Sequence, residues 1–116
     1  MTETLLDWNG LLRRVGDDRP LAAELARIFV ERSPDLLLEL NEAAAGKDST
    51  ALLRAAHGLK GALAVFGAAA AVALAQRLES FAAGGGNEPA PADLAELSAL
   101  TRQLESELTA QLALGR

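Results

Sequence analysis

Apolar residues recur along the chain at the three-to-four-residue spacing of amphipathic helices, and short polar or glycine-containing stretches separate these segments. The first segment predicts a short helix that is capped by Asp7 and runs to about Arg14. Leu11 and Leu12 would face inward, and Gly16 would end the helix.

The second segment predicts a helix with Asp17 or Asp18 as its cap. Pro20 falls in the first turn, where its missing N–H does no harm. Apolar positions then recur at helical spacing in two groups, Leu21, Leu25, Ile28 and Phe29, followed by Leu36, Leu37 and Leu40. Between the groups, Pro34 removes a backbone donor and is expected to bend the helix or split it in two. Gly46 should close the segment.

The third segment contains the only histidine of the chain, and Asp48 or Ser49 can cap it. We expect this helix to end or kink close to Gly67, because glycine weakens a helix. Another helix should follow from about Ala68 to Ala83.

The stretch GGGNEPAPAD is rich in glycine and proline and predicts a loop. After it, Asp93 is expected to cap a last helix, whose apolar core stripe comprises Leu94, Leu97, Leu100, Leu104, Leu108 and Leu112. Four substantial amphipathic helices with short connections predict an all-α fold: an antiparallel four-helix bundle with a short additional N-terminal helix laid against it. Residues 1–116 are expected to form a single domain.

Composition narrows the function classes. The chain has no cysteine, which excludes disulfides and thiolate metal sites. It shows neither a signal peptide nor an apolar run long enough for a membrane span, so we expect a cytoplasmic protein without membrane contact. The initiating Met1 and a last helix ending in Gly115 and Arg116 favour a stand-alone protein. Trp8 is expected to anchor the short first helix rather than to stack on a ligand.

The formal net charge is −5, and the eleven Lys and Arg residues are spread along the chain. This argues against a nucleic-acid surface, which depends on clustered cations. A protein partner or a small ligand is expected instead. A monomer is the default for a bundle that fills its own core.

The helix around the histidine has two different faces when residues are placed about 100° apart. An apolar stripe lies opposite His57 and comprises Leu52, Ala55, Leu59, Leu63 and Phe66. The residues within about 60° of the histidine are Lys60, Gly61, Ala64 and Ala68, with Arg54 one turn before it. His57 is therefore expected to point to solvent, on a face with cations, small residues and no acids.

These residue types favour phosphoryl transfer. An exposed neutral imidazole has a free lone pair and can act as a nucleophile, and Lys60 can neutralise charge on a phosphoryl group attached to His57. Arg54 is a second candidate for this role. Glycine inside a helix costs roughly 1 kcal/mol relative to alanine, so Gly58 and Gly61 are best explained if a partner approaches closely there. Hydrolysis is not favoured, because no acid or second base is expected to orient a water.

The sequence HGLKGALAVFGA resembles the signature of histidine-containing phosphotransfer (HPt) domains. The resemblance extends to LLRRVGDDRPLAAELARIFVERSPDLLLEL, to AAAGKDSTALLRAAHGLKG and to LAQRLE, and it covers nearly the whole chain. It implies a helical-bundle phosphorelay intermediate. In such an intermediate, Nε2 of His57 takes phosphate from a receiver-domain aspartate, Lys60 is the lysine near the phosphohistidine, and Gly61 leaves room for the receiver.

The resemblance also implies partners, and this sequence departs from the family pattern at a few positions. The partners would be a response-regulator receiver domain, a hybrid histidine kinase, or both. The Mg²⁺ that assists transfer would be held by the receiver, so no metal or cofactor site is expected in this chain. Glu79, 22 positions after His57, stands where some members have a glutamine near the histidine, and Gly58 stands where many have serine or threonine. Ala62, Ala64 and Val65 replace residues that are often more polar, and we expect this difference to affect which receiver fits.

Two other function classes remain open from the sequence. One is an adaptor bundle that binds receiver or kinase domains without phosphotransfer, which the absence of His57 or Lys60 would have favoured; both are present. The other is a phosphatase or metal-dependent hydrolase, which one histidine, no cysteine and scattered acids argue against. A histidine kinase is excluded, because nothing resembles an ATP-binding domain.

Overall fold

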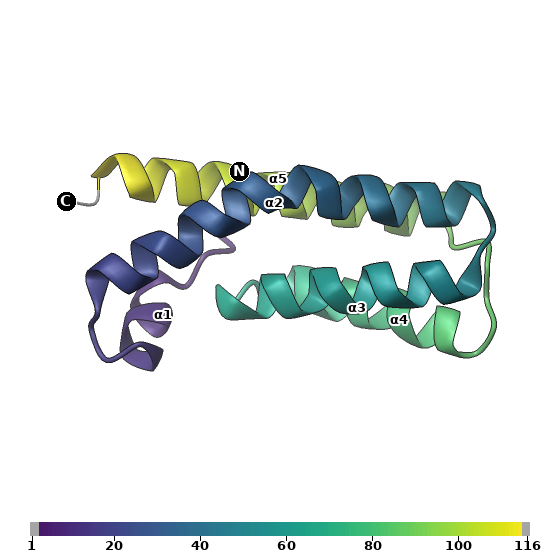
Figure 1. The fold of residues 1–116 in the computed structure, drawn as a ribbon, viewed down its shortest axis with the longest axis horizontal. Helices are drawn as coiled ribbons and strands as arrows, with labels where there is room; N and C mark the ends of the chain where they lie inside the picture. Colours follow the sequence, from purple (N-terminus) through teal and green to yellow (C-terminus); the bar gives the residue numbers. More distant parts are fainter. Residues whose placement is uncertain (1–2, 115–116) are drawn as a thin grey trace.

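The computed structural model describes residues 3–114, which form five helices. Their bounds are α1 (Trp8–Arg14), α2 (Arg19–Ala45), α3 (Ser49–Val65), α4 (Ala69–Ala83) and α5 (Pro91–Leu114). Helices α2 to α5 run alternately up and down as a four-helix bundle, and α1 lies at one end of it (Figure 1). The predicted fold class is therefore confirmed. The expected chain ends at Met1 and at Gly115 and Arg116 lie outside the described residues.

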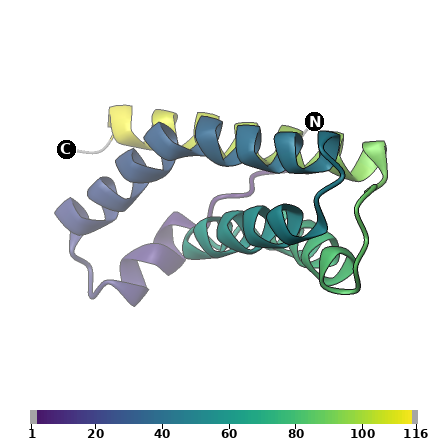
Figure 2. The ribbon, with the colours of Figure 1, turned by 45° about the vertical axis from the view of Figure 1, so that its right-hand side comes forward.

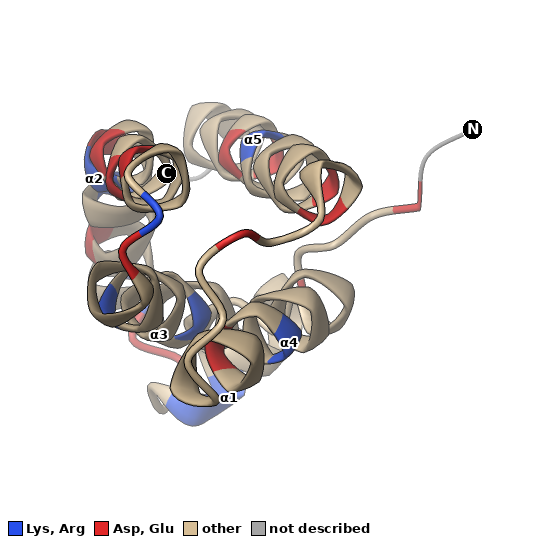
Figure 3. Ribbon diagram, turned by 90° about the vertical axis from the view of Figure 1, so that its right-hand side faces the viewer, with Lys and Arg blue, Asp and Glu red and all other residues tan. Residues whose placement is uncertain are grey.

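The bundle has two layers. Helices α2 and α5 form one layer and α3 and α4 the other, and each helix contacts its neighbour in the opposite layer (Figures 2 and 3). The core between the layers is built mainly of leucine and alanine. Across the described residues, no helix is long and apolar enough to cross a membrane.

Three aspartates cap helices in the same way. The carboxylates of Asp7, Asp18 and Asp48 each accept a hydrogen bond of 3.0 Å from the backbone N–H three residues later. Each cap satisfies one of the N–H groups that a helix start leaves without a partner. The caps predicted for α1, α2 and α3 are confirmed, with Asp18 rather than Asp17 and Asp48 rather than Ser49 as the capping residues.

The prediction that Asp93 caps the last helix is wrong. Helix α5 begins at Pro91, which fits the first helical position because its fixed φ suits the helix and it has no N–H to satisfy. Asp93 consequently lies in the first turn, where a carboxylate faces the positive end of the helix dipole, and it pairs with Arg77 of α4 at 3.4 Å.

Helix α2 continues through Pro34, so the proline does not split it. Figure 1 shows a change of direction partway along α2, as expected where a proline interrupts the hydrogen-bond ladder. Not every apolar residue of α2 faces the core, since Leu21 and Ile28 are each 43% exposed. Small residues take their place, and the buried positions of this helix are Ala22, Ala26, Phe29, Ser33, Leu37, Leu40 and Ala43.

Helix α5 departs in a similar way from its predicted leucine stripe. Leu97, Leu104 and Leu108 are fully buried, whereas the other three leucines are only partly buried. Ser98 and Thr101 occupy buried positions between them.

The turn between α3 and α4 lies at Gly67, as predicted, with a φ of +67° that glycine adopts without steric cost. Phe66 packs edge-on against Phe29 with ring centroids 5.3 Å apart. The N-terminal segment also holds this turn, because Asp7 N–H donates to the Phe66 carbonyl at 3.0 Å. At its other end the segment is tied to α5, where the Glu107 carboxylate accepts from the backbone of Leu5 and Leu6.

Candidate functional site

His57 lies in the middle of α3, and its side chain is 70% exposed. The opposite side of the helix supplies the core, since Leu52, Leu59 and Leu63 are fully buried. The orientation predicted from the helical repeat is therefore confirmed for the histidine and for these leucines.

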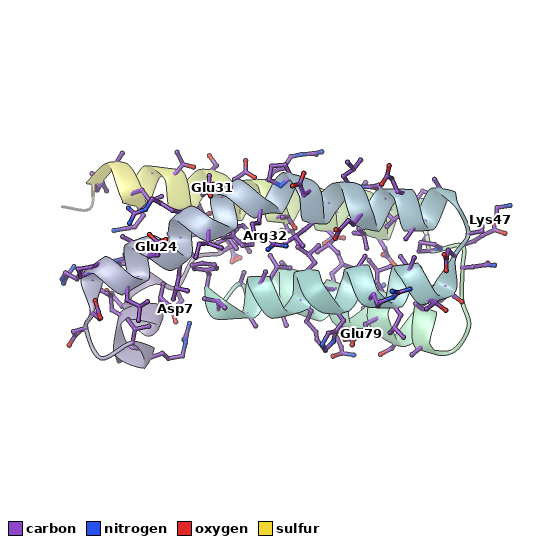
Figure 4. The ribbon with its side chains drawn as sticks, viewed as in Figure 1. Asp7, Glu24, Glu31, Arg32, Lys47 and Glu79 are labelled. Carbon is purple, nitrogen blue, oxygen red and sulfur yellow. The ribbon has the colours of Figure 1, made fainter. Side chains whose placement is uncertain are left out.

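The imidazole has an acidic partner on the neighbouring helix. Its Nδ1 lies 2.7 Å from Oε2 of Glu79, on α4, and the Glu79 side chain is only 17% exposed. Figure 4 places Glu79 on the side of the α3–α4 layer that faces away from α2 and α5. Because a carboxylate can only accept, Nδ1 carries the proton. The lone pair of the neutral ring is then on Nε2.

Lys60 completes this group of charges. Its ammonium forms an ion pair with Oε1 of Glu79 and donates to Oε1 of Gln76 at 2.9 Å. Lys60 comes from α3, one turn after His57, while Gln76 and Glu79 come from α4. The Glu79 carboxylate therefore joins the imidazole and the ammonium, one through each oxygen.

The helical repeat predicts a His57 face without acids, which holds for α3 itself, but an acid from the neighbouring helix does lie beside the imidazole. The helical repeat of α3 describes only that helix, whereas Glu79 approaches from α4. The available signal was the resemblance, which pointed to the position 22 residues after the histidine without defining the role of a glutamate there. Gln76 was missed altogether, because nothing in the sequence links it to Lys60.

The environment lowers the pKa of Glu79 below the ordinary glutamate value. The largest cause is hydrogen bonding to Lys60, and the second is hydrogen bonding to His57, against a smaller opposing effect of burial. A carboxyl group with a lowered pKa in the folded state stabilises the fold above its ordinary pKa. That contribution is lost as the pH falls through the lowered value.

We therefore expect Lys60→Ala to raise the pKa of Glu79 more than His57→Gln does, because Lys60 is the larger cause. A carboxyl carbon NMR titration of the wild type and the two variants measures both shifts. A larger rise in His57→Gln than in Lys60→Ala would contradict the assignment of the main partner.

The two glycines beside the histidine face open space. A Cβ added to Gly58 or Gly61 would meet no atom within 4 Å, so close packing between helices does not explain either residue. Ala64, on the same face, is also exposed. The prediction that Ala68 shares this surface is wrong, because Ala68 is fully buried. The helix ends before Gly67, and the helical repeat does not continue through the turn.

Arg54 is exposed on α3 but does not join the ionic group, which consists of His57, Lys60, Gln76 and Glu79. Within residues 3–114 it forms no hydrogen bond or ion pair, and it lines a separate hollow with Glu39, Glu42 and Asp48. The same described residues contain no group of three or more His, Asp or Glu side chains that could hold a metal ion.

An apolar groove of about 300 Å³ lies between α2 and α3, beside the face that carries His57. Among its lining residues, α2 supplies Leu25, Ile28 and Leu36, and α3 supplies Gly58, Ala62 and Val65. The sequence did not predict this groove, because it depends on how α2 lies against α3.

Comparison with known proteins decides the family. The profile of the Hpt domain matches residues 24–113. The chain belongs to the Hpt domain family. Hpt domains carry phosphoryl groups in two-component phosphorelays and are not autonomous kinases.

A solved Hpt domain has the same fold. It comes from an Hpt sensor hybrid histidine kinase of Shewanella and superposes with a TM-score of 0.84 at 22% identity, over 95% of each chain. No curated protein matches the chain in sequence. The sequence-based recognition of this Hpt domain is therefore confirmed.

Proposed function

We propose that His57 accepts a phosphoryl group on Nε2 from a receiver-domain aspartate and passes it to the aspartate of a response regulator. The observation that carries this proposal is the bond from His57 Nδ1 to Glu79, since it leaves the Nε2 lone pair free on a side chain that is 70% exposed. Lys60, one turn away, supplies a cation for the phosphoryl oxygens.

The transfer step needs little from this chain beyond these groups. The Nε2 lone pair forms the N–P bond as the P–O bond to the aspartate breaks, and the bonding electrons return to the aspartate carboxylate. The ring becomes cationic with its proton still on Nδ1, directly opposite the Glu79 carboxylate. In the onward step a carboxylate oxygen of the response-regulator aspartate forms a new P–O bond as the N–P bond breaks, and the N–P bonding electrons return to Nε2. Mg²⁺ would be held by the acidic pocket of the receiver, not by this chain.

Glu79 favours transfer over hydrolysis in this arrangement. One of its oxygens accepts from Nδ1 and the other pairs with Lys60 on a side chain that is only 17% exposed, so both oxygens are engaged within the protein and turned away from an attacking water. A phosphoryl group on Nε2 would lie on the far side of the ring from the carboxylate. Glu79 therefore acts on the ring and not on an attacking water.

The surroundings of His57 suit a receiver domain. Gly58 and Gly61 leave open space beside the ring, and the apolar groove between α2 and α3 offers a contact surface next to it. Lys60 places a cation one turn from the ring, although the whole chain has a net charge of −5. This cation complements the acidic pocket of a receiver.

The test uses a receiver domain phosphorylated by its kinase with labelled ATP. We expect label to move to this protein within minutes and to be lost in acid but retained in alkali, as a phosphoramidate bond requires. Binding of the receiver without label transfer would contradict the proposal and support the adaptor alternative. Acid-stable label would contradict a phosphohistidine.

A further inference from the structure

Lys60 has hydrogen-bonding capacity beyond its contacts in the site. A lysine ammonium has three N–H donors. One faces Glu79 Oε1, and one donates to Gln76 Oε1 at 2.9 Å. Among residues 3–114, no further acceptor binds this ammonium, so one donor remains available.

The Gln76 amide is held in one orientation. Because lysine can only donate, the group of Gln76 that faces Lys60 must be the carbonyl oxygen. The amide nitrogen then points along α4 and donates to Ser80 Oγ at 3.1 Å, one turn later. The Gln76 carbonyl oxygen, on α4, is therefore a fixed and neutral acceptor for the Lys60 ammonium.

We propose that Gln76 is a positioning residue for Lys60, and that its carbonyl holds the ammonium so that the remaining N–H is free for the phosphoryl group on His57. This inference rests on the proposed function. A glutamate here would add a second negative acceptor that competes with the phosphoryl group for Lys60. An apolar residue would allow the ammonium to turn wholly toward Glu79.

The experiment measures acceptance of phosphate from phosphoramidate, a small donor that needs no docking surface. The Nε2 lone pair forms the new N–P bond, and the P–N bond of the donor breaks to release ammonia. Gln76→Glu should slow acceptance about tenfold, the size expected when a hydrogen bond to a charged group is redirected. Gln76→Met should slow it less, because it removes the acceptor without adding a competing charge.

The decisive comparison repeats both Gln76 changes in a Lys60→Ala background. If Gln76 acts through Lys60, neither change should have a further effect there, which is non-additive behaviour. Gln111→Glu, on α5, makes the same change of net charge away from the site and should leave acceptance unchanged. Circular dichroism and thermal melting check that each variant is folded.

The outcomes separate this inference from the proposed function. Equal slowing by Gln76→Glu with and without Lys60 would overturn the positioning role alone, and so would a normal rate in Gln76→Glu. A wild-type protein that takes no phosphate at His57 from either phosphoramidate or a phosphorylated receiver would overturn the proposed function, and this inference with it.

Discussion

Replacing His57 with glutamine is expected to abolish phosphate acceptance while the bundle stays folded. The side chain is 70% exposed, so the substitution removes no core contact. The glutamine amide can still donate to Glu79, but its nitrogen has no lone pair available for attack on phosphorus. Transfer of label from a phosphorylated receiver should therefore fall to background, and the melting temperature should change by only a few degrees.

The receiver should still bind the His57→Gln variant, because the groove and the two open glycines are unchanged. Titration calorimetry with the unphosphorylated receiver provides this control. Labelling of the variant at the wild-type rate would show that another residue accepts the phosphate, and the assignment of His57 would then fail.

Replacing Gly61 with glutamine is expected to slow transfer from a receiver by about tenfold or more, with an unchanged rate from phosphoramidate. A Cβ at this position would meet no atom within 4 Å, so a side chain here starts into the open space that the partner would enter. A tenfold effect corresponds to a loss of about 1.4 kcal/mol in the interaction free energy with the receiver. The variant should also be slightly more stable, because glutamine is a better helix former than glycine.

Ala110→Gln is the matched control for Gly61→Gln. It adds a glutamine at an exposed position of α5, in the other layer of the bundle, and should leave both rates unchanged. Equal slowing of Gly61→Gln with both donors would point to a local effect on the histidine rather than to blocked docking. Unchanged rates with both donors would remove the steric role of Gly61.

Much of the fold could be predicted because its signals are local. Asp7, Asp18 and Asp48 act on N–H groups three residues away, and the turn at Gly67 depends on a single backbone conformation. The direction of His57 follows from the repeat of one helix. These features require no knowledge of how the helices pack.

The parts that could not be predicted depend on packing between helices. Glu79 and Gln76 reach the site from α4, and their distance from His57 and Lys60 is set by how α4 lies against α3. Ala68 was misplaced because the helical repeat stops at the turn. Leu21 and Ile28 have the spacing of core residues but remain exposed, since small alanines fill the core face of α2 at its start.

The tight turn at Gly67 has a consequence for folding kinetics. It joins two adjacent helices, so the residues of the ionic group are only 16 and 22 positions apart in the chain. In contrast, the bonds that tie Leu5 and Leu6 to Glu107 span more than 100 residues. Contacts between near neighbours in sequence form with a smaller loss of chain entropy. We therefore expect the groups proposed to handle phosphate to assemble early, as one helical hairpin, before the N-terminal segment closes across the bundle.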